Sequence, residues 1–217
     1  MDEVILIDKP DGITSFGVVA RVRRVLKERV GSKVKVGHTG TLDPFATGLL
    51  ILLAGKATKR SNEFLKKDKE YEAEIFLGST STTGAPEGEI SQVSDKVPSL
   101  EEIESVCSEF VGEISQKVPA FSAVKINGQR AYQLARSGKE VDTPTRKVTI
   151  YSIEILSYNY PVLKIKTFVS SGTYIRTLGE DIGAELKTGA YLTALRRTKI
   201  GDYSVSDAVK LDDFMNS

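Results

Sequence analysis

The chain has 217 residues, of which 40% are hydrophobic and 27% charged, and its formal net charge is +1. This composition is typical of a soluble globular protein, and no apolar run approaches the ~20 residues that a membrane-spanning helix needs. The N-terminus lacks the basic start of a secretory signal peptide. The single cysteine excludes an internal disulfide, and with only one histidine as well the usual metal clusters are excluded. We therefore expect a cytoplasmic protein without a metal or other cofactor.

The N-terminal quarter predicts a strand, a helix and a second strand. Residues 4–7 form a short apolar run that ends at the KPDG turn signal of 9–12. Ser15 is placed to cap the helix that follows. Apolar residues recur at helical spacing and predict its buried face: Val18, Val19, Val22, Val25 and Leu26. The apolar run 49–53 (LLILL) is too short for a helix of its own and predicts a buried strand.

The middle of the chain alternates short helices with strands. After a polar helix expected over 57–65, residues 69–78 alternate strictly between apolar and acidic positions, which predicts a half-buried strand. A Thr/Ser/Gly loop over 79–90 follows. Residues 99–102 (SLEE) then supply a capping box for a helix that ends near Gly112.

The rest of the chain predicts further hairpins. Asn127-Gly128 is a tight-turn signal, and the short helix expected over 129–137 stops at Gly138. Residues 146–170 predict a hairpin that turns near 159–161.

A helix over 174–187 and a strand over about 191–200 complete the pattern. Strands outnumber helices and lie mostly in hairpin order, and no linker divides the chain. We therefore expect the α+β class, with one domain over residues 1–217 and a mixed, largely antiparallel sheet flanked by helices.

The small net charge hides a strong segregation. Residues 15–69 carry thirteen Lys and Arg against four Asp and Glu, whereas residues 84–115 carry eight acids and one base. Residues 116–149 are basic again, with seven Lys and Arg against two acids. Such segregation is typical of a protein that binds a polyanion, although amphipathic helices with solvated basic faces would give the same pattern.

The loop GHTGTLDPFATG, residues 37–48, holds the single histidine and an aspartate, Asp43, within the basic region. Pro44 pushes the preceding Asp43 towards an extended conformation. A carboxylate displayed on such a loop can act as a nucleophile or a general base. A turn at an Asp-Pro pair would need the same residues without any catalysis. The loop alone leaves both interpretations open.

Phosphate-binding and dinucleotide-binding patterns fail in this region. A GxxxxGK[ST] loop would need glycine at Leu50, and Ala57 stands where serine or threonine is required. A GxGxxG fingerprint is also missing here. Nucleotide hydrolysis and hydride transfer therefore have no support in the sequence.

Two other candidates lie far along the chain from Asp43. Arg176 lies just inside a predicted helix N-terminus, where the helix dipole disfavours a cation. A bidentate pair with a carboxylate would repair this conflict and keep the acid ionised, whereas a surface pair with Glu180 is the alternative. Tyr71 falls on the apolar side of its strand, as a core tyrosine also would.

Taken together, six ordered blocks resemble the TruB-type tRNA pseudouridine synthases. The blocks are VILIDKPDGITS, VGHTGTLDPFATGLLILLAGKATK, KEYEAEIFLG, VPAFSAVKINGQRAYQLARSG, VSSGTYIRTLGEDIG and LTALRRTKIG. They extend from about Val4 to Asp202, which is nearly the whole chain.

The resemblance implies roles for the three candidate catalytic residues. Asp43 would be the catalytic aspartate. Tyr71 would stack on the target base and act as the base that removes a proton late in the reaction. Arg176 would pair with Asp43 and orient it, in agreement with the charge argument above.

Other residues would bind the substrate. The resemblance implies that His38 contacts the flipped nucleotide or fills the space that it leaves. Tyr174 and Leu195 would line the base pocket, and Lys9 and Pro10 would brace it from behind. The segment 122–143 would be a mobile loop that closes over the RNA arm.

The activity implied is isomerisation of uridine 55 in the tRNA T-loop to pseudouridine after base flipping. Such a reaction needs no metal, redox partner or nucleoside triphosphate. The expected partner is the T-arm of tRNA, and we expect a monomer with no obligate protein partner and no membrane contact. Two alternatives are a non-catalytic RNA-binding or RNA-folding protein on the same scaffold, and the relative that works inside a guide-RNA particle.

The sequence departs from the family pattern in two ways. Thr82 and Ala85 stand where family members usually carry acidic residues, which concerns local loop contacts more than catalysis. No C-terminal RNA-binding PUA domain, as many bacterial members have, is evident. We therefore expect weaker or shorter-reaching contact with the acceptor arm.

Overall fold

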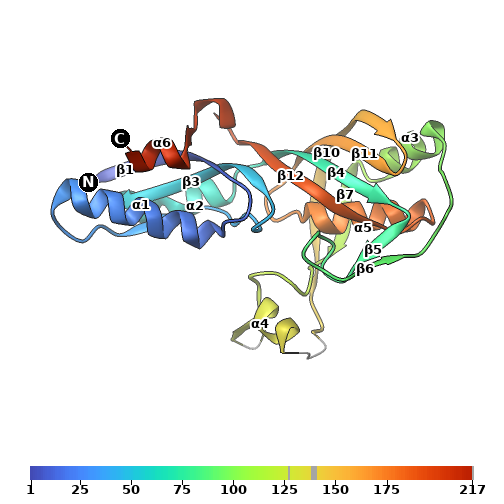
Figure 1. Cartoon of the computed structure of the whole chain (residues 1–217), viewed down its shortest axis with the longest axis horizontal. Coiled ribbons are helices and arrows are strands. Elements are labelled where there is room, and N and C mark those ends of the chain that lie inside the picture. Colours follow the sequence, from blue (N-terminus) through green and yellow to red (C-terminus); the bar gives the residue numbers. More distant parts are fainter. Residues whose placement is uncertain (127, 138–140, 217) are drawn as a thin grey trace. The chain divides into compact units, whose positions relative to one another are not determined.

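A computed structural model describes residues 1–126, 128–137 and 141–216 of the chain (Figure 1). The fold comprises two compact units, one formed by Met1–Glu72 with Ala194–Ser217 and the other by Ala73–Thr193. The chain passes between these units within two strands, β4 (Lys69–Leu77) and β12 (Ala190–Ile200). No linker sequence marks the division because both crossings lie inside regular strands.

The first unit is built on strands in the order β14-β1-β3-β12. β1 (Asp2–Lys9) runs antiparallel to β3 (Thr47–Gly55) and parallel to β14 (Val209–Lys210), while β12 pairs parallel with β3. The short strands β2 (Val36–His38) and β13 (Tyr203–Ser204) pair antiparallel with β3 and β12. The mixed and largely antiparallel sheet of the predicted α+β class is thus confirmed in this unit.

β3 is buried on both faces, which explains its unbroken apolar sequence. Leu50 and Leu52 pack with helices α1 (Ser15–Val30) and α6 (Leu211–Asn216). The alternate residues of the strand pack on the other face with Phe64. Because successive side chains of a strand point to opposite faces, a strand between two layers must be apolar throughout.

The α1 helix has the predicted buried face but a different cap. Val18, Val19, Val22, Val25 and Leu26 are buried as predicted. The N-cap is Thr14, whose hydroxyl accepts a hydrogen bond from the Gly17 N–H at 2.9 Å, so the prediction of Ser15 as the cap was wrong by one residue. Ser15 is the first helical residue, and its hydroxyl contacts a distant loop instead.

The polar helix expected over 57–65 consists of two pieces. A 3₁₀ turn, η1 (Lys56–Arg60), leads into the short helix α2 (Ser61–Leu65). None of the helices in the described part of the chain is long and apolar enough to cross a membrane.

The second unit contains strands in the order β4-β11-β10-β7. β10 (Thr145–Asn159) runs antiparallel to β11 (Val162–Val169), which is the predicted hairpin, and to β7 (Gly112–Lys117). The predicted alternation of β4 is confirmed, with its apolar side chains buried. The helices of this unit include α3 (Leu100–Glu109) and α5 (Ile175–Glu185).

The capping box predicted in the second unit is confirmed. Ser99 and Glu102 form the capping box of α3 through reciprocal hydrogen bonds. α5 packs closely on β12 through Gly183, because a Cβ there would collide with Ala190. The two ends of the predicted 79–90 loop pair with each other as the short strands β5 (Ser79–Ser81) and β6 (Ile90–Gln92).

The described residues of the segment predicted to be a mobile loop, 122–143, form three short elements. These are β8 (Lys125–Ile126), β9 (Gln129–Arg130) and α4 (Ala131–Arg136). Two predicted signals of this segment, the turn residue Asn127 and the helix stop at Gly138, lie outside the described residues.

Candidate active site

The residues predicted for the site fall in both units. Tyr174 and Arg176 belong to the second unit. The first unit holds the others: Lys9, Pro10, His38, Asp43, Tyr71 and Leu195. The predicted pair of Asp43 with Arg176 would join one residue from each unit and stays a prediction.

Asp43 is held between two fixed neighbours. On its N-terminal side, the Ser15 hydroxyl donates to the Leu42 carbonyl at 2.9 Å and accepts from the Leu42 N–H at 2.8 Å. On its C-terminal side, the Pro44 carbonyl accepts hydrogen bonds from the Lys9 ammonium at 3.0 Å and from the Gly12 N–H at 3.0 Å. The backbone that carries the half-buried carboxylate is therefore restrained from both directions.

The turn that follows Asp43 is closed by the main chain. The Ala46 N–H donates to the Asp43 carbonyl at 3.1 Å. Any residue could supply this backbone acceptor, so this hydrogen bond does not require a carboxylate. The turn interpretation of the Asp-Pro pair therefore explains the backbone but not the choice of aspartate.

Lys9 supports the loop from the end of β1. Its side chain is fully buried, and its ammonium donates to the carbonyls of Pro10 at 2.8 Å and Pro44 at 3.0 Å. A buried ammonium is costly unless it is hydrogen-bonded, and these carbonyls offset that cost. Pro10 itself is exposed, so its link to the site is through its carbonyl.

Arg197 holds the first half of the same loop, and sequence reasoning missed it. Only 1% of this residue is exposed. Its Nε donates to the Leu49 carbonyl at 2.8 Å, and its two terminal nitrogens donate to Gly40 at 3.1 Å and Thr41 at 3.5 Å. The alternation of β12 carried the signal, because it places Arg197 on the same buried face as Leu195.

Gly48 is required where β3 meets β12. It pairs with Arg197 in the parallel register and has a φ of +101°. A Cβ at this position would collide with the Arg197 backbone carbonyl. The glycine lets the strand that follows the Asp43 loop approach the strand that carries Arg197.

The surroundings of His38 favour the neutral form of its imidazole. Burial and the nearby Arg197 charge both lower its pKa from the ordinary value of 6.5. Its Nδ1 accepts a hydrogen bond from the Gly40 N–H at 3.4 Å. A neutral imidazole fixed in this way can contact a nucleotide by hydrogen bonding or packing, as the predicted role in substrate binding requires.

Tyr71 and Leu195 are both buried in the first unit. Lys69 lies on the same side of β4 as Tyr71, and its ammonium donates to the carbonyls of Leu65 and Lys67. Burial, with a smaller contribution from Arg197, lowers the pKa of Lys69 to about 8. Lys69 and Arg197 therefore lie close enough for their charges to repel each other.

Arg176 joins two loops of the second unit to α5. It lies in the first turn of the helix, as predicted, and is 5% exposed. Its terminal nitrogens donate to the carbonyls of Thr83 at 2.8 Å and Phe121 at 2.7 Å. The guanidinium is therefore fixed by groups on segments about 40 residues apart in sequence.

Tyr174 is positioned just before the same helix by its main chain. The Gln116 side chain accepts from the Tyr174 N–H at 2.7 Å and donates to the Tyr174 carbonyl at 3.0 Å. The Arg146 guanidinium lies 5.7 Å from the centre of the Tyr174 ring. Gln116 is a second positioning residue that the sequence did not reveal.

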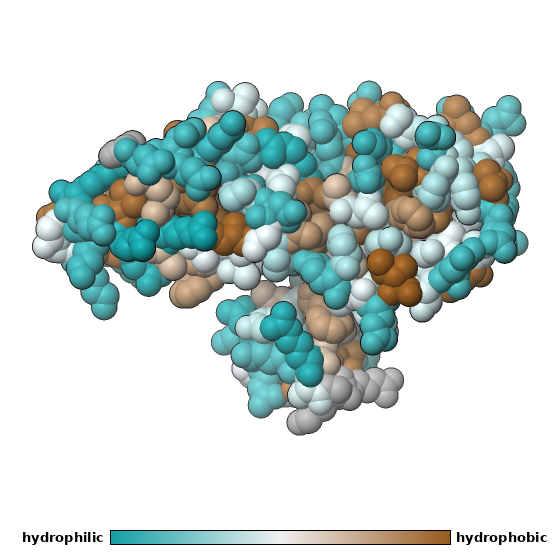
Figure 2. All heavy atoms as spheres, viewed as in Figure 1, coloured by the Kyte–Doolittle hydropathy of each residue, from teal (hydrophilic) through white to brown (hydrophobic). Residues whose placement is uncertain are grey.

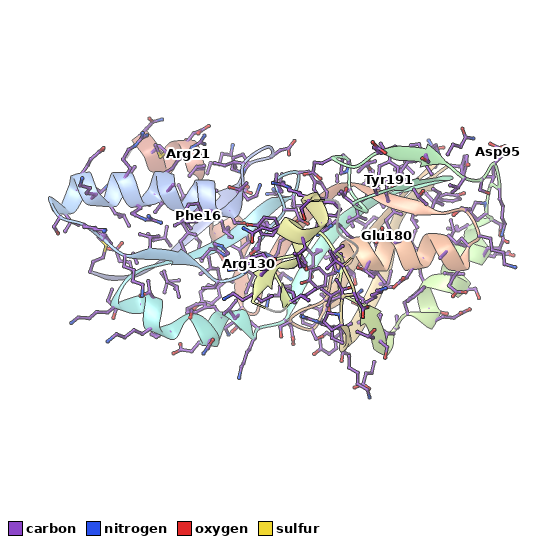
Figure 3. All side chains as sticks on the ribbon, turned by 90° about the horizontal axis from the view of Figure 1, so that it is seen from below. Phe16, Arg21, Asp95, Arg130, Glu180 and Tyr191 are labelled. Atoms are coloured by element: carbon purple, nitrogen blue, oxygen red, sulfur yellow. The ribbon has the colours of Figure 1, made fainter. Side chains whose placement is uncertain are left out.

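Glu180, labelled on α5 in Figure 3, is the alternative partner of Arg176. Burial raises its pKa, while the Arg176 charge acts in the opposite direction. Its carboxylate lies against Gly84, where an added Cβ would come within 2.8 Å of Oε1. Glu180 therefore lies close to the loop that also accepts a hydrogen bond from Arg176.

Comparison with known families identifies the family of this chain. The model described as "TruB family pseudouridylate synthase (N terminal domain)" matches residues 23–175, and the "tRNA pseudouridylate synthase B C-terminal domain" matches residues 176–217. The chain belongs to the TruB family. TruB relatives named tRNA pseudouridine synthase B include one from Aquifex aeolicus, 46% identical over all of this chain and 75% of its own length. Another, from Endomicrobium trichonymphae, is 45% identical over 98% of this chain and 91% of its own length.

Solved structures give the same fold. The Cbf5-Nop10-Gar1 complex contains a chain that is 32% identical, with a TM-score of 0.74 over 98% of this chain. The archaeal box H/ACA sRNP Nop10-Cbf5 complex gives a TM-score of 0.71 at 31% identity. The chain spans about half the length of these structural relatives, 53% and 52% respectively.

The loop that carries Thr82 and Ala85 is closed by its own polar groups. The Ser81 hydroxyl donates to the Ala85 carbonyl at 2.6 Å. The Thr82 hydroxyl accepts from the Glu89 N–H at 3.1 Å, and the Thr82 N–H donates to the Glu89 carbonyl at the same distance. Hydroxyl and backbone groups thus order this loop around Thr82 and Ala85.

Among the described residues, no group of three or more His, Cys, Asp or Glu side chains could hold a metal ion.

Proposed function

We propose that this chain converts uridine 55 of the tRNA T-loop to pseudouridine, with Asp43 as the catalytic carboxylate. The observation that carries the assignment of Asp43 is the restraint of its backbone by Ser15 on one side and Lys9 on the other. A reactive group held in place before substrate binds avoids reorganisation during the reaction. The tRNA substrate is supported by the relatives named tRNA pseudouridine synthase B, which match at 45–46% identity.

The reaction is an isomerisation and balances without a co-reactant. The bond from uracil N1 to ribose C1′ breaks, the base turns, and C5 bonds to C1′. C5 loses a proton and N1 gains one. The Asp43 carboxylate initiates these steps either by adding to C6 of the base or by attacking C1′ of the ribose. Both routes need an ionised carboxylate and a base that has left its stack.

The other site residues would hold the extruded base and the catalytic carboxylate. Base flipping costs a few kcal/mol, and stacking on an aromatic ring returns about 1–3 kcal/mol per base. We assign this stacking and the late removal of the C5 proton to Tyr71. Arg176 would keep Asp43 ionised and oriented by a bidentate pair.

The remaining predicted residues complete the substrate site in this proposal. Tyr174 and Leu195 would line the base pocket, His38 would contact the flipped nucleotide, and Lys9 with Pro10 would brace the pocket. The segment 122–143 would close over the T-arm. The protein would act as a monomer in the cytoplasm, without an obligate protein partner.

The test uses purified protein and an unmodified tRNA transcript. Pseudouridine is mapped by chemical labelling after incubation with the wild type, Asp43→Asn and Asp11→Asn. Asp11 is an exposed aspartate in the turn after β1, where it accepts from the Gly12 N–H, and serves as the matched control. We expect product at position 55 with the wild type and Asp11→Asn, and at least a 10³-fold slower reaction with Asp43→Asn. Equal rates for the two variants would disprove the role of Asp43.

The same assay separates the two alternatives. A protein that binds free tRNA but forms no pseudouridine would be the non-catalytic RNA-binding protein. Activity that appears only with a guide RNA and added partner proteins would assign the chain to the guide-particle type, whose known structures share its fold.

A further inference from the structure

The solvent-facing side of α1 is strongly basic. Arg21, Arg24 and Lys27 are exposed on this helix, and Arg23 is half-buried at the edge of the same face. Glu28 is the only acid between Ser15 and Lys35 in the sequence. In Figure 2, hydrophilic atoms occur together with hydrophobic ones on the surface where α1 lies.

This charge arrangement weakens the helix itself. Arg21 with Arg24, and Arg24 with Lys27, are three residues apart, and Arg23 with Lys27 are four apart. Like charges at these spacings repel across the helix surface. Within the described part of the chain, Arg21, Arg24 and Lys27 form no ion pair that would relieve the repulsion. The helix is stabilised by its buried face, so the basic face is not needed for folding.

An exposed aromatic ring lies at the start of this face. Phe16 is 66% exposed, which is unusual for a phenylalanine. The Arg23 guanidinium lies 5.8 Å from the centre of its ring. Phe16, Arg23 and Lys27 are spaced by seven and four residues, so they follow one side of the helix. Figure 3 labels Phe16 and Arg21 on α1.

The same end of α1 is tied to the loop of Asp43. Ser15, next to Phe16, makes both hydrogen bonds to Leu42, the residue before Asp43. The helix has 16 residues and is therefore about 24 Å long. The basic face starts beside the candidate catalytic loop at Phe16 and extends to Lys27, which is about 17 Å along the helix.

We propose that the basic face of α1 binds the sugar–phosphate backbone of the substrate RNA outside the target loop, with Phe16 stacking on an unpaired base. We define this face as Phe16, Arg21, Arg23, Arg24 and Lys27. A row of cations with an exposed aromatic is the combination that binds nucleic-acid strands. The substrate assignment rests on the proposed function.

A membrane surface would also attract a basic helix, but the packing of α1 argues against it. Helices that bind membranes insert an apolar face into the lipid. The apolar face of α1 is buried against β1 and β3 in the protein core. RNA needs only the exposed cations and the ring, which are the groups that this helix presents.

The experiment compares two triple variants of equal net charge. Arg21→Gln/Arg24→Gln/Lys27→Gln removes three cations of the face and keeps residues with good helix propensity. Lys147→Gln/Lys164→Gln/Lys199→Gln removes three exposed cations that pair with carboxylates elsewhere, and serves as the control. Dissociation constants for unmodified tRNA are measured between about 50 and 200 mM salt.

We expect the α1 variant to bind tRNA at least tenfold more weakly than the wild type at the low salt. The slope of log K against log salt should become shallower by about 2 to 3 for three lost phosphate contacts. The kcat at saturating tRNA should not change. Affinity and slope equal to those of the control variant would overturn the proposal.

A second variant tests the stacking step. Phe16→Leu keeps an apolar side chain but removes the ring, and we expect roughly a fivefold or larger loss of affinity without a change in salt slope. Wild-type affinity would exclude stacking. The membrane alternative is tested with anionic phosphatidylserine vesicles. If the wild type binds them, and the α1 triple variant loses this binding but keeps its tRNA affinity, the face binds membranes and the RNA assignment is overturned.

These outcomes are independent of the proposed function. A wild-type protein that forms no pseudouridine would refute the function. The affinities and salt slopes of the same proteins would still decide whether the α1 face binds RNA.

Discussion

Replacing Ser15 with alanine separates the support of the catalytic loop from the stability of α1. The Ser15 hydroxyl makes two hydrogen bonds, both to the main chain of Leu42, at 2.9 and 2.8 Å. Leu42 is buried, so the variant leaves a buried N–H and a buried carbonyl without this partner. An unsatisfied buried polar group costs about 1–3 kcal/mol, and we expect Ser15→Ala to lose about 2–4 kcal/mol of unfolding free energy.

The neighbouring hydroxyl supplies the control. Thr14 caps α1 through the Gly17 N–H, and Thr14→Ala should cost about 1 kcal/mol of stability. This variant touches only the helix, whereas Ser15→Ala also releases the residue before Asp43. We therefore expect kcat to fall at least tenfold for Ser15→Ala and to stay near the wild-type value for Thr14→Ala.

Urea unfolding gives the stability of both variants, and pseudouridine formation is measured at a temperature where both are folded. A Ser15→Ala enzyme with wild-type kcat would show that the loop does not depend on this contact. A similar loss of kcat in both variants would show that the helix start, rather than the hydrogen bonds to Leu42, matters.

Three further predictions follow from groups in the two units. Gly48→Ala should lower the unfolding free energy by about 3 kcal/mol or more, because its Cβ would collide with the Arg197 backbone. In the control Gly37→Ala, the added Cβ meets no heavy atom within 4 Å, so thermal unfolding should show a loss of less than about 1 kcal/mol. The lowered pKa of His38 means that the unfolded chain binds the proton more readily, so stability should fall as the pH drops below 6.5, and His38→Gln should flatten this dependence in urea titrations. Burial raises the pKa of the Cys107 thiol to about 11, so iodoacetamide should label this thiol at ~pH 8 only in the unfolded protein. Labelling of the native protein would contradict the burial of Cys107.

Periodic segments were predictable from the sequence because one local pattern fixes both their type and their buried side. The alternation of β4 and the apolar spacing of α1 are examples, and both were confirmed. The capping box of α3 was predictable for a similar reason, since Ser99 and Glu102 act within one turn. The short strand β2 was missed because three residues carry too little pattern, and its place depends on pairing with β3.

The cap of α1 shows where local signals fail. Thr14 and Ser15 are adjacent, and both residue types are good N-caps. The choice between them is made by Leu42, which is 27 residues away in sequence and takes both hydrogen bonds of Ser15. A local argument cannot include a partner so distant along the chain.

The same limit applies to the candidate site. The resemblance to a family selected Asp43, Tyr71 and Arg176 from motif positions, but it gave no reason for the rigidity of the Asp43 loop. That reason lies partly in Arg197, whose contacts with Gly40 cross 157 residues. Only the pairing of β3 with β12 brings these residues together.

Arg197 can act through its charge or through its shape, and the single histidine of the chain allows the two to be separated. Arg197→Met removes the charge, so the pKa of His38 should rise towards 6.5 but remain below it, because burial is the larger cause of the shift. Arg197→Lys keeps the charge but not the planar fork that reaches Gly40 and Leu49. Arg197→Lys should therefore leave the His38 pKa low while kcat falls.

Proton NMR titration reports His38 without ambiguity because the chain has one histidine. An unchanged His38 pKa in Arg197→Met would show that the buried guanidinium does not set the potential in this loop, and wild-type kcat in Arg197→Lys would show that its hydrogen bonds do not hold Asp43 in place.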